Sequence, residues 1–103
     1  MKQVAITGER RAVLLDTPEL QPFDNWVVVK IHAVPMCTEY KRYLSGEPTE
    51  RLGHEAAGEV VAVAQPGRVK VGDRVVAMPQ YGCGVCPLCV AGDYIHCENT
   101  AAF

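Results

Sequence analysis

The chain has 103 residues, of which 49% are hydrophobic and 21% charged, and its formal net charge is −2 at pH 7. These values suit one ordinary globular domain, and the scattered basic residues argue against a protein that binds nucleic acid or a charged membrane surface. No apolar run approaches the roughly 20 residues that cross a bilayer, and the N-terminus lacks the apolar segment of a signal peptide. We therefore expect a cytoplasmic protein whose partners include neither nucleic acid nor membrane.

The first third of the chain predicts a hairpin followed by a long strand. Residues 2–7 and 12–16 carry alternating apolar side chains on either side of a glycine turn, as hairpin strands do. Residues 17–22 contain two prolines, which discourage a helix and predict an extended linker. The valine-rich stretch 26–34 is the strongest strand. Its His32 is more often packed or hydrogen-bonded in such a position than used as a ligand.

A short helix is predicted after this strand. Thr38 is a favourable N-cap residue for a helix over residues 39–44, and Ser45 followed by Gly46 is a typical helix end. Cys37 directly precedes this helix. The thiol therefore lies between the end of a strand and the start of a helix.

The remaining elements are short strands separated by turns. Residues 59–64 form a strand, and 65–67 form a turn with proline before glycine, as a type II turn requires. Residues 69–71 are short and extended, and 74–78 form a further strand. Short strands spaced by about eight to twelve residues predict a mainly β barrel or sandwich rather than a parallel sheet.

Four of the five cysteines gather near the C-terminus with the spacing Cys-x2-Cys-x2-Cys-x7-Cys. They are Cys83, Cys86, Cys89 and Cys97. Zinc binds four thiolates in a tetrahedron with Zn–S bonds of about 2.3 Å, and Cys-x2-Cys steps bring successive sulfurs onto one ion. Gly82 and Gly84 allow the backbone to turn inward. The pattern predicts a closed structural zinc lobe over residues 80–99.

Other uses of these cysteines are two disulfides, four free thiols or a rubredoxin-like iron site. Three cysteines within seven residues are poorly placed for disulfides, because bridged Cα atoms need separations of about 4.4–6.8 Å. An iron site of that kind usually pairs two separated Cys-x2-Cys loops. The spacing rules for cysteine sites therefore favour zinc.

A second set of possible ligands is Cys37, His54 and Glu55. One thiolate, one imidazole and one carboxylate are the mixed ligands of a catalytic zinc site, which keeps a position open for water or substrate. Neighbouring residues of an extended strand point to opposite faces, so His54 and Glu55 share an ion only if the backbone bends, as Gly53 permits. Taken alone, Cys37 is as often a small buried hydrophobic residue.

These residues lead to a family. The stretch Gly53–Gly58 reads Gly-His-Glu-Ala-Ala-Gly, and Val71–Val75 reads Val-Gly-Asp-Arg-Val. With Cys37 after a valine-rich strand, and with the cysteine lobe and its Gly92, the chain resembles the N-terminal GroES-like catalytic domain of zinc-dependent medium-chain dehydrogenases/reductases. This family includes alcohol, sorbitol and threonine dehydrogenases. The resemblance implies, over residues 1–103, a mainly β, partly open GroES-like barrel with a short helix and a zinc lobe.

The resemblance also implies a function. In such enzymes Cys37 and His54 would be catalytic-zinc ligands, Glu55 a ligand or close neighbour, and the lobe cysteines ligands of a structural zinc. Members of the family oxidise a small alcohol or polyol, with zinc activating the alcohol for hydride transfer to NAD or NADP. The parent enzyme is expected to be a homo-oligomer.

The chain departs from the family pattern directly after Cys37. The family usually has a variable residue, then serine or threonine, then aspartate, whereas this chain has Thr38, Glu39 and Tyr40. Thr38 is a candidate proton relay from a shifted register, and Glu39 is a candidate base or zinc neighbour. The alternative is that Glu39 is a solvated glutamate on the helix surface.

The sequence contains no Gly-x-Gly-x-x-Gly turn of a nucleotide-binding Rossmann domain in a strand–helix context. We therefore expect a truncated catalytic domain of a zinc-dependent NAD(P) alcohol or polyol dehydrogenase that is inactive alone. The alternative is a free-standing zinc-binding structural or assembly module without catalysis. The enzyme hypothesis predicts about two zinc ions per chain, and the module predicts one.

Overall fold

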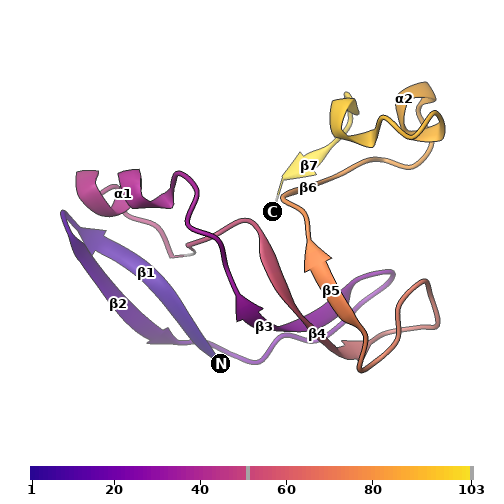
Figure 1. Cartoon of the computed structure of the whole chain (residues 1–103). Coiled ribbons are helices and arrows are strands. Elements are labelled where there is room, and N and C mark those ends of the chain that lie inside the picture. Colours follow the sequence, from indigo (N-terminus) through magenta and orange to yellow (C-terminus); the bar gives the residue numbers. More distant parts are fainter. Residues whose placement is uncertain (51, 103) are drawn as a thin grey trace.

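The computed structural model describes residues 1–50 and 52–102, and strands dominate it (Figure 1). Three separate antiparallel sheets, with strand orders β1-β2, β3-β4-β5 and β6-β7, form in this part of the chain and do not close into a barrel. The expected mainly β, partly open architecture is confirmed. Two short α-helices and one 3-10 helix accompany the strands.

The N-terminal hairpin consists of β1 (Lys2–Gly8) and β2 (Arg11–Asp16), close to the predicted ranges. Ala5 and Ile6 of β1 are buried, and the other residues of the hairpin are partly or fully exposed. Only a narrow part of the hairpin therefore packs against the remaining structure.

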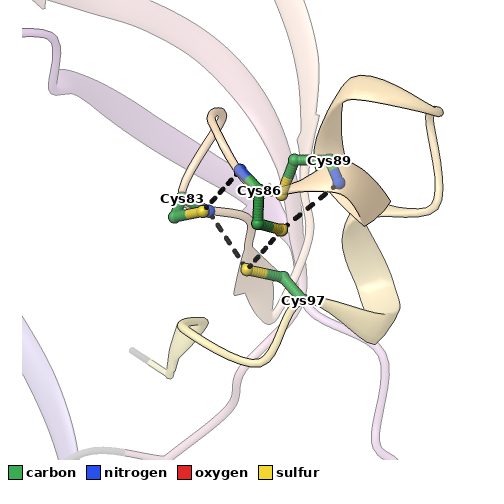
Figure 2. A group of neighbouring side chains, drawn as sticks. All are labelled: Cys83, Cys86, Cys89 and Cys97. Carbon is green, nitrogen blue, oxygen red and sulfur yellow. Dashed lines mark hydrogen bonds between the residues drawn. The ribbon is translucent and has the colours of Figure 1, made fainter.

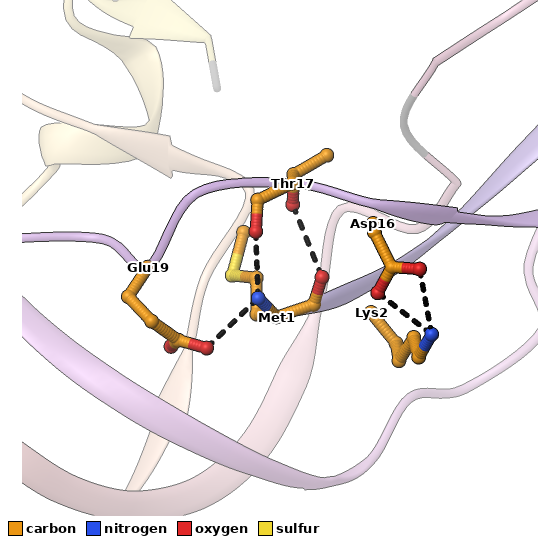
Figure 3. A network of polar contacts seen from close by, with 5 residues as sticks. All are labelled: Met1, Lys2, Asp16, Thr17 and Glu19. Carbon is orange, nitrogen blue, oxygen red and sulfur yellow. Dashed lines mark hydrogen bonds and ion pairs between the residues drawn. The ribbon is translucent and has the colours of Figure 1, made fainter.

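Polar contacts close the open end of this hairpin (Figure 3). The N-terminal ammonium of Met1 donates to the carbonyl of Thr17 at 2.6 Å and pairs with Glu19 at 2.8 Å. Beside it, Nζ of Lys2 pairs with Asp16 at 2.6 Å. Exposed pairs of this kind contribute about 0–1 kcal/mol each, so they guide the linker after β2 rather than determine the fold.

The central sheet consists of β3 (Val27–Ala33), β4 (Ala56–Val63) and β5 (Arg74–Ala77), with β4 in the middle. Strand β4 begins three residues before the expected residue 59, because both neighbouring strands pair with its first residues. Val60 of β4 is fully buried. This early start places His54 and Glu55 directly before the central strand.

The connection from β4 to β5 was expected to include a short extended segment at 69–71. These residues do not form part of a strand in the structure. The Asp73 carboxylate accepts the backbone N–H of Lys70 at 2.9 Å, and Gly72 has φ +93°. Gly67 does not have a positive φ, so the expected type II turn at 65–67 is wrong. The Val-Gly-Asp sequence therefore makes the turn that returns the chain as β5.

Helix α1 (Glu39–Ser45) begins and ends close to the predicted positions. Gly46 follows it with φ +76°, as expected of a glycine at a helix end. Thr38 is the N-cap residue, as predicted, but its hydroxyl makes no capping hydrogen bond. The backbone N–H of Arg10 donates to the carbonyl of Tyr43 at 2.7 Å, which joins α1 to the hairpin.

A backbone bridge anchors the segment that follows α1. The N–H of Ile6 donates to the carbonyl of Thr49 at 2.8 Å, and the N–H of Thr49 donates to the carbonyl of Ile6 at 3.1 Å. Since Ile6 is almost fully buried, this bridge holds the chain close to the hairpin shortly before His54.

The C-terminal lobe contains β6 (Gln80–Tyr81), α2 (Pro87–Val90), the 3-10 helix η1 (Tyr94–His96) and β7 (Ala101–Ala102). Figure 1 shows it as a separate yellow-orange unit beyond the end of β5. The ring of Tyr81 meets Trp26 edge-on, with centroids 5.0 Å apart, and so connects the lobe with the start of β3. No helix in the described ranges has the length and apolar composition of a membrane span.

Candidate metal sites

The four lobe cysteines form the densest group of possible metal ligands in the described part of the chain (Figure 2). Their Sγ atoms all lie within 4.8 Å of one another. A regular tetrahedron with Zn–S bonds of about 2.3 Å has edges of about 3.8 Å, and the Sγ atoms of Cys86 and Cys97 are 3.8 Å apart. The group therefore fits a tetrahedral zinc ion.

Backbone N–H groups point at these sulfurs. The N–H of Cys86 donates to Sγ of Cys83 at 3.4 Å, and the N–H of Cys89 donates to Sγ of Cys86 at 3.5 Å. The N–H of Asn99 donates to Sγ of Cys97 at 3.3 Å. Such donors stabilise thiolates and orient them as ligands.

The four thiols do not ionise equally without a cation. Backbone N–H groups of Val85 and Cys86 lower the pKa of Cys83 to about 6. The N–H of Gly84 lowers the pKa of Cys89, but burial and the neighbouring sulfurs raise it more, to about 12. A cluster in which some thiols resist ionisation becomes a set of four thiolates when a divalent cation compensates their charge.

Local sequence explains how the lobe curls around its sulfurs. Cys86 is the N-cap of α2, where Pro87 provides the preset φ of a first helical residue. A Cβ on Gly82 would lie 2.5 Å from Sγ of Cys89, so only glycine lets the chain pass this sulfur. All five cysteines of the chain are free, and no disulfide joins them.

The second candidate site is built around Glu39, the first residue of α1. Glu39 is only 8% exposed. Its Oε2 accepts the backbone N–H of Cys37 at 2.9 Å, and its Oε1 contacts Nδ1 of His54. The structure therefore joins three of the candidate catalytic residues through one carboxylate, and Glu39 is not a solvated surface residue.

The surroundings of Glu39 favour its charged form. The backbone N–H of Glu39 itself lowers the pKa of its carboxyl group most, and burial opposes this effect. The N–H of Cys37 and the neighbouring imidazole of His54 lower this pKa further. Glu39 therefore presents a buried anion to His54.

A cavity of about 400 Å³ opens beside this pair. Its lining consists of Thr38, Glu39, Arg42, Thr49, Leu52, Gly53 and His54. Neither Arg42 nor Thr49 was predicted from the sequence to be a site residue. Arg42 follows Glu39 by three residues on α1, so helical periodicity places both on one face. Thr49 reaches the cavity through its bridge to β1, for which the sequence carries no local signal.

Neither Glu55 nor the side chain of Cys37 takes part in the contact between Glu39 and His54. His54 also borders a second, apolar hollow, and Glu55 lines that hollow together with Met78. Cys37 is exposed. Within residues 1–50 and 52–102, the lobe cysteines are the one group of three or more ligands whose donor atoms lie this close together. The Cys37–His54–Glu55 ligand set therefore stays a prediction.

The positions that depart from the family pattern have different surroundings. Thr38 lines the cavity beside Glu39, whereas the side chain of Tyr40 is 47% exposed. His32 is also exposed and is not among the residues that line the cavity beside Glu39. Gly53 has φ +101°, which supplies the backbone bend that the sequence predicted before His54.

Comparison with known proteins assigns the family. The family model described as alcohol dehydrogenase GroES-like domain matches residues 23–103. The chain belongs to this family. The resemblance to medium-chain dehydrogenases/reductases that the motifs predicted is thereby confirmed.

Its relatives among the alcohol dehydrogenase GroES-like domains are named as oxidoreductases. The chain is 42% identical over 92 residues to an L-threonine 3-dehydrogenase from Symbiobacterium thermophilum, covering 81% of this chain and 26% of that protein. It is 35% identical over 102 residues to a sorbitol dehydrogenase from Bacillus subtilis, and this match covers 90% of this chain and 28% of that protein. The solved structure of the alcohol dehydrogenase TADH from Thermus sp. ATN1 superposes with a TM-score of 0.81 at 26% identity. The superposition covers 100% of this chain and 32% of that chain. The chain therefore spans about a third or less of these relatives.

Proposed function

We propose that this chain is the metal-binding part of a zinc-dependent dehydrogenase that oxidises a small alcohol or polyol with NAD or NADP. Membership of the alcohol dehydrogenase GroES-like family is the observation that carries this proposal. Relatives named threonine and sorbitol dehydrogenases support the substrate class. Since the chain covers 26% and 28% of these two relatives, the nicotinamide site would come from another part of such an enzyme.

The chain's own residues have separate tasks in this proposal. Cys83, Cys86, Cys89 and Cys97 would hold a structural zinc, and Cys37, His54 and Glu55 would hold the catalytic one. Zinc in the open site supplies a Lewis acid that lowers the pKa of the substrate hydroxyl. A thiolate, an imidazole and a carboxylate are chemically suited to such a site. The buried Glu39 anion beside His54 favours a cation there.

Thr38 is the proposed carrier of the substrate proton. Thr38 lines the same cavity as His54, and its hydroxyl makes no capping bond to α1, which supports a role in relaying a proton to solvent. The two oxygens of Glu39 already face Cys37 and His54, which favours a holding role over that of a general base. We expect no dehydrogenase turnover from this chain alone.

Zinc counting tests the proposal. Purified chain should contain two zinc ions by elemental analysis, Cys37→Ala one, and Cys86→Ala should lose the lobe ion. The Cys37→Ala variant serves as the specific test, because it leaves the lobe ligands intact. A zinc content that is the same in Cys37→Ala and wild-type chain would contradict the ligand role of Cys37.

The second candidate function is a zinc-binding structural module without catalysis. It is favoured by one observation: the lobe cysteines alone, among the described residues, have their donor atoms clustered. One zinc ion per wild-type chain would support this function over the dehydrogenase. Either function needs reduced thiols, which is why we keep a cytoplasmic location in the proposal.

A further inference from the structure

We propose that Glu39 is the positioning residue of the open metal site, a role that rests on the proposed function. One carboxylate oxygen fixes the backbone at Cys37, and the other fixes His54 so that Nε2, not Nδ1, is left to bind the metal. A single side chain thereby sets the relative placement of two candidate ligands from distant parts of the sequence.

The contacts of Glu39 support this role. Oε2 accepts the N–H of Cys37 at 2.9 Å, and Oε1 lies against Nδ1 of His54. Oε1 is buried and lacks a hydrogen bond of good geometry, although it is in close contact with the imidazole. A buried carboxylate oxygen in this condition is costly unless positive charge lies nearby. An imidazole bound to a divalent cation supplies that charge.

The only ion pair found for Glu39 in the described part of the chain is the one with His54. Arg42 also lines the cavity, but its Nε pairs with Glu47 at 3.6 Å. The carboxylate is therefore not occupied by the nearest arginine. Its position between Cys37 and His54 is what a carboxylate–histidine–metal arrangement requires.

The chemistry of imidazole determines which nitrogen is available. A neutral imidazole has one N–H donor and one nitrogen with a free lone pair. A carboxylate beside Nδ1 favours the proton on Nδ1 and leaves the lone pair on Nε2. His54 lines two cavities, and Glu55 lines the second of them. In this tautomer Nε2 is the nitrogen with the lone pair that would bind the metal.

The test compares wild-type chain with Glu39→Gln, which keeps the size of the side chain and an oxygen acceptor but removes the charge. With zinc already in the lobe, competition with a chelator measures the affinity of a second zinc ion. Loss of such an outer carboxylate typically weakens metal binding about 10- to 100-fold, and we expect a loss in this range. Glu47→Gln, which changes an exposed glutamate on the neighbouring loop, should bind both ions as wild type does.

Histidine ¹⁵N NMR of the chain with zinc only in the lobe gives a second readout that a purely structural role would not change. Wild-type His54 should carry its proton on Nδ1, and Glu39→Gln should shift His54 toward the Nε2–H form. Glu39→Asp, which restores the charge with a shorter reach, should recover part of the affinity lost in Glu39→Gln.

The outcomes separate this inference from the function on which it rests. If wild-type chain binds two ions and Glu39→Gln binds the second equally well with an unchanged His54 tautomer, Glu39 has no positioning role, while the proposed function stands. If wild-type chain binds one ion only, the proposed function is contradicted, and this inference with it. A weaker second ion together with a changed tautomer supports the inference.

Discussion

Gly58 of β4 lies so close to β3 that it leaves no room for a side chain. A Cβ at this position would lie 2.2 Å from the carbonyl oxygen of Lys30 and 2.8 Å from Cγ1 of Val29. Because the first of these neighbours is backbone, no side-chain rotation relieves the clash. The last glycine of the Gly-His-Glu-Ala-Ala-Gly motif therefore has a packing role, separate from the proposed ligand role of His54.

Replacing Gly58 with alanine should destabilise the chain by about 1–3 kcal/mol, the usual cost of forcing extra volume into a packed site. Urea unfolding of the zinc-loaded chain measures this loss. The matched control is Gly67→Ala, since a Cβ there meets no atom within 4 Å and the backbone does not have a positive φ. Equal stability of Gly58→Ala and Gly67→Ala would contradict the close approach of the two strands.

In metal-free chain whose lobe still has its native arrangement, the lobe cysteines should differ in reactivity. Cys83 has a pKa lowered to about 6 by the N–H groups of Val85 and Cys86, so at pH 7 it is mostly thiolate. Cys89 has a pKa of about 12: the N–H of Gly84 lowers it, but burial and the adjacent sulfurs raise it more, so at pH 7 it is a thiol. Thiolates are the reactive form.

Iodoacetamide at pH 7 should therefore alkylate Cys83 faster than Cys89 by more than about tenfold, even after allowing for the weaker nucleophilicity of a low-pKa thiolate. Peptide mass spectrometry measures both rates. Below pH 6 the rate at Cys83 should fall as its thiolate is protonated, and zinc should protect both residues. Equal rates at the two cysteines would show that the N–H groups around Cys83 do not stabilise its thiolate.

At the scale of elements, the sequence predicted the hairpin, β3, α1 and the lobe well because their signals are local. Apolar alternation defines strands, glycine ends the helix, and cysteine spacing defines the lobe. The start of β4 was missed because Ala56, Ala57 and Gly58 have low β propensity, and pairing with β3 and β5 decides their conformation.

The candidate open site was predictable only in part. Cys37, His54 and Glu55 follow from motif and residue chemistry. The burial of Glu39 does not, because it depends on a contact with His54, which lies 15 residues further along the chain. Thr38 shows a similar limit: its position as the N-cap residue was predictable, but its hydroxyl makes no capping bond, and the N–H of Lys41 donates to the Thr38 carbonyl at 2.9 Å.

The whole molecule has a small apolar interior. Among the described residues, the buried hydrophobic side chains are Ala5, Ile6, Val60 and Cys97. Cys97 alone belongs to the lobe, and it is a metal-ligand candidate. Buried apolar surface is the main source of folding free energy, and the lobe has little of it. We therefore expect its fold to depend on the proposed zinc ion.

A chelator should therefore loosen residues 80–99 before the rest of the chain. Hydrogen exchange should show rapid loss of protection at these amides, while amides shared by β3 and β4 remain protected. Adding back zinc should restore the original pattern. Unchanged protection of residues 80–99 after chelation would argue against a structural zinc in the lobe.

Trp26 is the only tryptophan of the chain, and its ring lies edge-on against Tyr81 at the entrance to the lobe. Indole emission responds to neighbouring rings and to water. The native chain thus contains an optical reporter at the boundary between the central sheet and the cysteine cluster. Ordering of the lobe can be followed in real time without an added label.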